Sequence, residues 1–441
     1  MEEQSVSGMS RGQKVLVIIA GIASYLDAAI LVSCGVALPL WTKFFAFSPL
    51  VTGSINTVLT LSVAVGAMSG GVLSDKLGRV VVFNIDILFV AIGTAMIAFT
   101  SNVTLLFIGL VIAGIASGAD LPTSLAVISE RMDKDNYGKA ISSTQLYWTV
   151  GIILSQLIGY LTANLAGIGA VRFLFGVIAV VALLNWYVRN FSKRFRHIED
   201  AEQAAVQAAE GTENVAEAKP KFGEVFKDKH VLVPLLLLTG FYLFWNIPAN
   251  SFGMFLNYFL VIVDKQAAAT ATLVAMIGNL LGFVANLIFM KVSDTKYRYP
   301  IMFTGLILGA VAMLIAGLSA TYWFAFSVCY VVYMFGYIWI GEPIYKIWAQ
   351  SFYPVNLRAS MTGFSLGVVR AFTAVFALIT PTLMAISPAL FLRVLLGCVI
   401  VYGAFSMLIV KMIKRYHLHD VALEKAQAAK AEKQALAHEK L

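Results

Sequence analysis

Long apolar runs separated by short polar breaks occupy the chain from about residue 15 to about residue 415. We count about twelve such runs, and each approaches the roughly 20 residues that a helix needs to cross a bilayer. Their centres fall near residues 27, 62, 90, 115, 152, 181, 247, 279, 309, 336, 372 and 401. The pattern predicts an all-α integral membrane protein with about twelve transmembrane helices.

Two changes of composition divide the chain. Residues 191–230 are rich in Ala, Glu and Lys, and residues 415–441 are also Ala-rich and charged. We therefore expect six-helix bundles over residues 1–190 and 231–414, joined by a cytoplasmic linker over 191–230. The tail over 415–441 is expected to be a solvated cytoplasmic helix rather than a binding module.

The two halves carry matching motifs at a constant spacing. VLSDKLGR at 72–79 corresponds to KVSDTKYR at 291–298, and an RxxxG motif recurs at nearly the same offset. The alignment pairs Asp75 with Asp294, and it pairs Arg79 with Arg298. Internal repeats of this kind are typical of transporters. The repeat therefore predicts two pseudo-symmetric six-helix bundles with a binding site between them.

Composition and charge agree with this prediction. The chain is 59% hydrophobic and only 13% charged, whereas soluble domains carry about 25% charged residues. Most Lys and Arg fall on one set of alternate connections, which predicts that both termini are cytoplasmic. We expect the protein to lie in the cell (inner or plasma) membrane. The basic residues form no stripe with interleaved aromatics, so we expect no nucleic-acid partner. The polar first 14 residues indicate that no signal peptide is removed.

Ionisable residues inside a span cost about 2.5 to 3.5 kcal/mol each on insertion scales, so they need a partner, water or a function. None of the five histidines lies in a predicted span, so a proton relay at depth must use carboxylates. We predict that Asp27 and Asp120 couple transport to protons, because burial lets a carboxyl group load and release a proton near neutral pH. The alternative is a structural pair or a hydrogen bond to a neighbouring helix. For Asp86, close to the cytoplasmic loop, the structural interpretation is preferred.

Polar and amphipathic side chains in the second half suit a hydroxylated solute, because amides both donate and accept hydrogen bonds and aromatic rings pack on apolar faces. Glu342 and Lys346 are four residues apart, so they form either a buried charge pair or a site where Lys346 faces substrate. Arg370 cannot lose its proton and needs a carboxylate or an anionic substrate. The alternative for the amides is interhelical hydrogen bonding. The predicted substrate-binding set is Gln145, Trp245, Asn246, Asn250, Tyr258, Asn279, Lys346 and Arg370.

Three motifs carry a family resemblance. GVLSDKLGR at 71–79 resembles the second-loop signature of the major facilitator superfamily, and the resemblance covers all twelve spans. GADLPTSLAVISE at 118–130 and QLYWTVGI at 145–152 are similar to segments of sugar porters and of metabolite and aromatic-acid proton symporters. The chain departs from sugar porters at Lys346, where they have a sugar-stacking Trp, and at Ser351, where they have Glu. The arginine that proton antiporters carry in span four is also missing, with Leu110 nearest its place.

The resemblance implies alternating access by rocking of the two bundles, with a cytoplasmic charged gate. The gate residues that it implies are Asp75, Arg79, Glu130, Asp294, Arg298 and Arg358. We therefore predict a proton-coupled symporter that imports a sugar, polyol or sugar acid. An organic- or aromatic-acid:proton symporter is the alternative, and a multidrug/proton efflux antiporter is less favoured.

Enzymatic function is not expected, because the sequence offers neither a nucleophilic motif nor a metal cluster, and it lacks an ATP-binding loop. The expected partners are a small-molecule substrate, protons and the lipid bilayer. We expect neither a cofactor nor a metal, and we expect the protein to be a monomer.

Overall fold

The structure of the chain is a computed structural model. It describes residues 11–77, 79–131, 134–191, 228–293, 295–320, 322–353, 358–416, 418, 420 and 422–428. Within these ranges every regular element is a helix. The chain divides into two compact units, Met1–Ala216 and Glu217–Leu441, and the division falls inside the segment predicted to be the linker.

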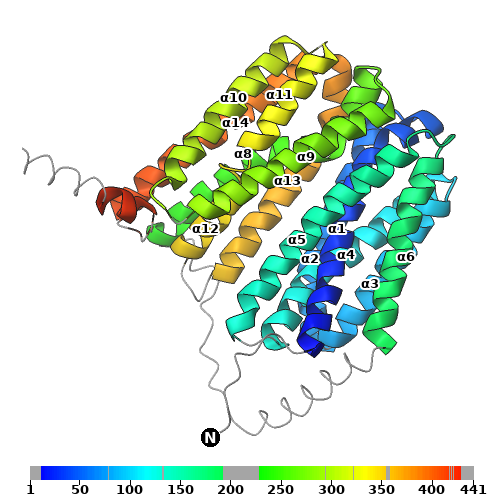
Figure 1. Cartoon of the computed structure of the whole chain (residues 1–441), viewed down its shortest axis with the longest axis horizontal. Helices are drawn as coiled ribbons and strands as arrows, with labels where there is room; N and C mark the ends of the chain where they lie inside the picture. Colours follow the sequence, from blue (N-terminus) through cyan, green and yellow to red (C-terminus); the bar gives the residue numbers. More distant parts are fainter. Residues whose placement is uncertain are drawn as a thin grey trace, which may run out of the picture. The chain divides into compact units, whose positions relative to one another are not determined.

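In the described part of the first unit, six long helices run alongside one another (Figure 1). Their bounds are α1 Arg11–Phe45, α2 Pro49–Leu77, α3 Arg79–Phe99, α4 Val103–Arg131, α5 Lys134–Thr162 and α6 Gly169–Phe191. Helix α4 packs on α2 and α3, while α1 packs on α5 and α3 packs on α6.

Glycines allow α2 and α4 to approach closely. A Cβ atom at Gly118 would overlap the Val63 carbonyl oxygen, and one at Gly66 would overlap the Ile115 carbonyl oxygen. Ser117 and Asp120 flank this contact on α4. The close packing therefore fixes the depth of both polar side chains within the first unit.

The second unit contains α8 Lys229–Tyr258, the π-helical η2 Phe259–Val263, and a further series of α-helices (Figure 1). That series is α9 Ala268–Val292, α10 Arg298–Leu318, α11 Trp323–Gly336, α12 Glu342–Phe352, α13 Arg358–Ile386 and α14 Pro388–Tyr416. Helix α8 packs on α13 and α14, and α10 packs on α11 and α14.

The helices confirm the predicted fold class. Among the described residues, ten helices are long and apolar enough to cross a membrane, and two shorter apolar helices, Leu146–Thr162 and Trp323–Gly336, lie at the predicted centres 152 and 336. Cys34, Cys329 and Cys398 are buried, as expected of packing residues. The spans therefore follow the hydrophobic pattern, with one interruption after α11.

The expectation of a solvated tail after residue 414 is wrong for its first part. Helix α14 continues to Tyr416, and residues 422–428 form another short helix. Asp420 and Ala422 are buried, at 3% and 0% exposure. The physical reason is an ion pair between Asp420 Oδ2 and Arg298 Nη1 at 2.9 Å, which holds this segment against α10.

Candidate functional site

An interrupted helix lies inside the second unit. Helix α11 ends at Gly336 and α12 begins at Glu342, with Pro343 in its first turn. Residues 337–341 between them lack helical structure, so the end of α11 leaves carbonyl groups without intrahelical partners. Discontinuous membrane helices of this kind form substrate and ion sites in secondary transporters. The sequence pattern predicted one continuous span here and missed the break.

Trp245 of α8 packs against this break. Its indole Nε1 donates to the Tyr337 carbonyl oxygen at 3.1 Å, which satisfies one of the orphaned groups. The Trp245 ring stacks between Tyr337 and Tyr242, with centroid distances of 5.5 Å on both sides. Gly341 makes this approach possible, because a Cβ atom there would lie 2.5 Å from the indole. The break, the indole and Gly341 therefore form one packed unit.

Polar groups from α8 and α13 adjoin this aromatic stack. Thr373 Oγ1 donates to Asn246 Oδ1 at 3.3 Å, which joins the two helices. Arg370, one turn before Thr373, is half-buried and lies within electrostatic range of the Tyr242 hydroxyl, as does Glu342. The structure thus brings together three predicted substrate residues, Trp245, Asn246 and Arg370, and adds Thr373 to them.

The Glu342–Lys346 pair forms, but the prediction that it is buried is wrong. Lys346 Nζ lies 2.7 Å from Glu342 Oε1, and the two side chains are 59% and 44% exposed. The reason is the break after α11, because α12 is a separate helix of 11 residues whose polar face carries both side chains. This pair is therefore worth only the few tenths of a kcal/mol typical of exposed ion pairs.

The other predicted substrate residues of the second unit have different surroundings. Asn279 donates to the Ala275 carbonyl oxygen of its own helix at 2.9 Å. Tyr258 is buried near the end of α8, and Asn250 is half-buried. The side chain of Gln145 lies outside the described residues.

In the first unit, Asp27 of α1 is buried and accepts a hydrogen bond from the Ser117 hydroxyl of α4. A serine hydroxyl can donate to a carboxylate and can accept from a carboxylic acid. The contact can therefore persist whether or not Asp27 carries a proton. Sequence reasoning selected Asp27 but not Ser117, because serines are common on α4 and the crossing point of α1 and α4 could not be predicted.

Asp120 does not stand alone, because Arg189 of α6 binds it. Arg189 Nη1 and Nη2 each lie 3.0 Å from Asp120 Oδ1, and Nη1 lies 3.3 Å from Asp86 Oδ1. All three residues are buried, with at most 5% of each residue exposed. Sequence reasoning counted Arg189 among the loop cations, and the helix extends two residues beyond it to Phe191. We call Asp86, Asp120 and Arg189 the carboxylate–arginine triad.

Of the six predicted gate residues, Arg298 is described by the structure. It pairs with Asp420, and its Nε donates to the Ser293 carbonyl oxygen. The side chains of the others lie outside the described residues: Asp75, Arg79, Glu130, Asp294 and Arg358. Sequence reasoning missed Asp420, because the charged tail gave no periodic pattern that pointed to a buried partner.

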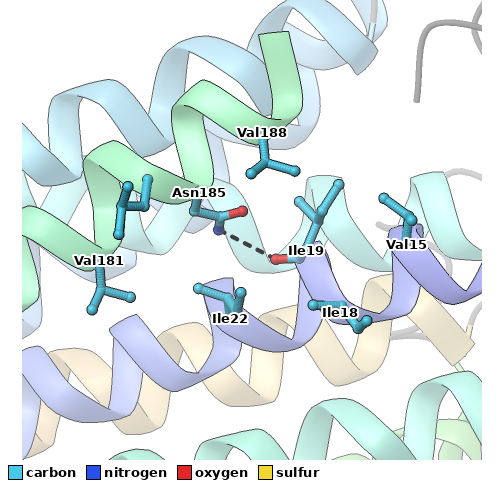
Figure 2. A pocket seen from close by; sticks show the side chains of 8 residues that line it. Val15, Ile18, Ile19, Ile22, Val181, Asn185 and Val188 are labelled. Atoms are coloured by element: carbon cyan, nitrogen blue, oxygen red, sulfur yellow. Dashed lines mark hydrogen bonds between the residues drawn. The ribbon is translucent and has the colours of Figure 1, made fainter. Parts of the chain in front are cut away.

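An apolar groove of about 300 Å³ lies between α1 and α6 (Figure 2). Valine, isoleucine and leucine side chains line it, and its polar member, Asn185, donates to the Ile19 carbonyl oxygen at 3.3 Å. Such a lining suits apolar chains rather than a hydroxylated solute. Among the described residues, no group of three or more His, Cys, Asp or Glu side chains is placed to hold a metal ion.

Outside the spans, Asp264 follows η2 directly. Its Oδ2 atom is buried without a hydrogen-bond partner, and burial raises the pKa of this carboxyl group to about 6. This residue lies away from the break after α11 along the chain, and it is a candidate for a pH-dependent contribution to stability.

Comparisons with known proteins agree with this architecture. The family model described as Major Facilitator Superfamily matches residues 17–378. The minor myo-inositol transporter of Bacillus subtilis (strain 168) is 28% identical over 399 residues, which are 87% of each chain. The arabinose-proton symporter of Escherichia coli (strain K12) is 27% identical over 68% of this chain and 66% of its own length.

A solved structure shares the fold. The crystal structure of a D-xylose-proton symporter superimposes with a TM-score of 0.68 at 16% identity, covering 89% of this chain and 97% of that one.

Proposed function

Because the chain belongs to the Major Facilitator Superfamily, we propose that it is a proton-coupled symporter that imports a sugar or polyol by alternating access. The names of its relatives support this substrate class, since one transports myo-inositol and another couples arabinose to protons. The chain is thus a multi-pass membrane transporter. We further propose that it is a monomer in the cell membrane with both termini in the cytoplasm, and that the predicted gate residues close its cytoplasmic side.

The proposed proton coupling rests on one observation, the buried carboxyl group of Asp27. Its carboxyl group is buried within α1 and holds the Ser117 hydroxyl, a partner compatible with both protonation states. Proton uptake would neutralise the buried charge, and the associated desolvation energy would then no longer oppose closure of the bundle around it. Asp120 contributes to coupling through the carboxylate–arginine triad rather than alone.

The group around the break after α11 supports a hydroxylated substrate. The Tyr337–Trp245–Tyr242 stack holds Trp245 between two rings, so we propose that its ring edge, rather than a free ring face, borders the substrate site. Asn246 and Thr373 add amide and hydroxyl groups that donate and accept hydrogen bonds. We propose that Trp245, Asn246 and Arg370 contact substrate, whereas Asn250, Tyr258, Asn279, Lys346 and the undescribed Gln145 are secondary candidates.

Arg370 favours a sugar acid as the second candidate substrate. Among the described side chains it has no carboxylate within ion-pair distance, because Glu342 pairs with Lys346. A guanidinium in this setting binds a carboxylate in a bidentate manner. The choice between a neutral and an acidic solute therefore depends on whether Arg370 contacts the substrate directly.

Uptake by purified protein in proteoliposomes tests the proposal. With an inward proton gradient, we expect concentrative uptake of labelled myo-inositol, a pentose or a sugar acid, which a protonophore abolishes. Aromatic acids and lipophilic cations should neither be taken up nor inhibit. Accumulation that persists with protonophore, or uptake restricted to aromatic acids or lipophilic cations, would contradict the proposed function.

A further inference from the structure

The carboxylate–arginine triad places two acids on one base inside the first unit. Asp86 comes from α3, Asp120 from α4 and Arg189 from α6, so the triad joins three helices. The Nη1 atom of Arg189 donates to a carboxylate oxygen of each acid and also to the Phe83 carbonyl oxygen. With both acids ionised, this buried group would carry one net negative charge.

The hydrogen bonding of the two acids is unequal. Asp120 accepts from both terminal nitrogens of Arg189, and its Oδ2 accepts from the Ser124 hydroxyl at 3.0 Å. Asp86 has one contact with Arg189, at 3.3 Å, and its buried Oδ2 has no partner. An ionised carboxylate with an unsatisfied buried oxygen is costly, whereas a proton on that oxygen removes the excess charge.

Among the described side chains, no further cation compensates for this excess. The charged side chains that the structure describes on the other helices of the unit, or elsewhere on α6, are Lys14, Asp27, Lys43 and Arg172. Lys14 and Lys43 are exposed, and Arg172 bonds to Ser101 near the opposite end of α6. Asp27 contacts α4 through Ser117, one turn before Asp120, and adds negative rather than positive charge.

Arg189 is held so that it cannot leave the acids. Its guanidinium carbon lies 3.5 Å from the centre of the Phe83 ring, and the side chain is 1% exposed. A guanidinium keeps its proton at every relevant pH. The variable charge of the triad therefore resides on the carboxyl groups.

We propose that Asp86 and Asp120 form a second proton-binding site, which holds one proton between them under the control of Arg189. An O–H bond forms at Asp86 when the site loads and breaks when the proton leaves to water, without any redox step. This inference rests on the proposed proton coupling and adds a site to it. The contact chain Asp27–Ser117 and the triad share α4, so movement of α4 would affect both proton sites.

Infrared titration of the purified full-length protein tests the second site, because a protonated carboxyl group has a carbonyl stretch that a carboxylate lacks. Because a protonated Asp27 would absorb in the same region, the titration uses the Asp27→Asn background, in which we expect a buried, protonated-carboxyl band to remain. Asp86→Asn should remove the band, because Asp120 and Arg189 then form a neutral pair. Asp120→Asn should also change it, which provides a second variant if one of the two fails to fold.

The outcomes separate this inference from the proposed function. If Asp86→Asn and Asp120→Asn both leave the full protonated-carboxyl absorbance at all pH values, the shared proton does not exist. If instead the band behaves as expected but Asp27→Asn still accumulates substrate, the second proton-binding site is supported and the proposed role of Asp27 in proton coupling is wrong. A change in the pH profile of substrate exchange in Asp86→Asn would show that the second proton takes part in transport.

Discussion

Substitution of Gly341 tests whether the break after α11 forms part of the substrate site. The added methyl group changes the packing around Trp245 without removing any polar group. In the Gly341→Ala variant, the added Cβ would lie 2.5 Å from the Trp245 indole, whereas ordinary contacts are 3.4–4 Å. The indole must therefore move by about 1 Å. That movement disturbs the 3.1 Å bond to the Tyr337 carbonyl and the stacking of Trp245 between two tyrosines.

Overpacking of this kind costs about 1–3 kcal/mol. If Trp245 contacts the substrate, a comparable loss should appear in transport, as a KM raised about fivefold to a hundredfold. The assay is the initial rate of substrate uptake into proteoliposomes, at matched protein content, over a range of substrate concentrations. The melting temperature of the detergent-solubilised variant reports the packing cost separately.

Gly253 is the matched control, because it lies on the same helix as Trp245 and an added Cβ there meets nothing within 4 Å. Gly253→Ala should leave KM unchanged. If Gly341→Ala transports with the wild-type KM, the indole either does not move or does not contact substrate. The assignment of a substrate surface at the break would then be wrong.

Three further predictions concern charged groups. Asp420→Ala should remove the buried ion pair with Arg298, at a cost of up to about 5 kcal/mol, and should increase hydrogen exchange in residues 422–428; unchanged exchange would contradict this docking. The pKa of Asp264 is raised from 3.8 to about 6 by burial in the folded protein. Its contribution to the free energy of unfolding is therefore most favourable below about pH 4 and is lost as the pH rises through about 6. Asp264→Asn should therefore flatten the pH dependence of the melting temperature over that range, and an unchanged slope would refute it. A double-mutant cycle of Glu342→Gln and Lys346→Gln should give a coupling of only about 0.3–0.5 kcal/mol, and several kcal/mol would mean that the pair is buried.

The helices could be predicted from the sequence because lipid imposes one solution on a long apolar segment. The predicted centres of the twelve spans all fall within helices of the structure. The break after α11 could not be predicted in the same way, because Tyr337 to Gly341 is as apolar as a helix. The hydrogen bond from Trp245 to the Tyr337 carbonyl oxygen and the one from Trp339 to the Ala285 carbonyl oxygen hold this segment off the helical path.

The candidate site was only partly predictable. Intramembrane acids such as Asp27 and Asp120 are conspicuous in an apolar segment, so the sequence indicates them directly. Their partners, Ser117 and Arg189, are far away along the chain and depend on which helix faces cross. Arg189 also lies near the end of its span, where a positive charge is ordinary, and only the packed structure shows that it is buried.

The most direct test of proton coupling through Asp27 compares two transport modes of one variant, Asp27→Asn. Counterflow exchanges labelled for unlabelled substrate and needs no net proton movement, whereas accumulation against a gradient needs the coupling proton. We predict that the variant retains counterflow and loses accumulation, because the amide holds the Ser117 contact but cannot carry a proton. Accumulation at the wild-type level with the wild-type pH dependence would contradict the account.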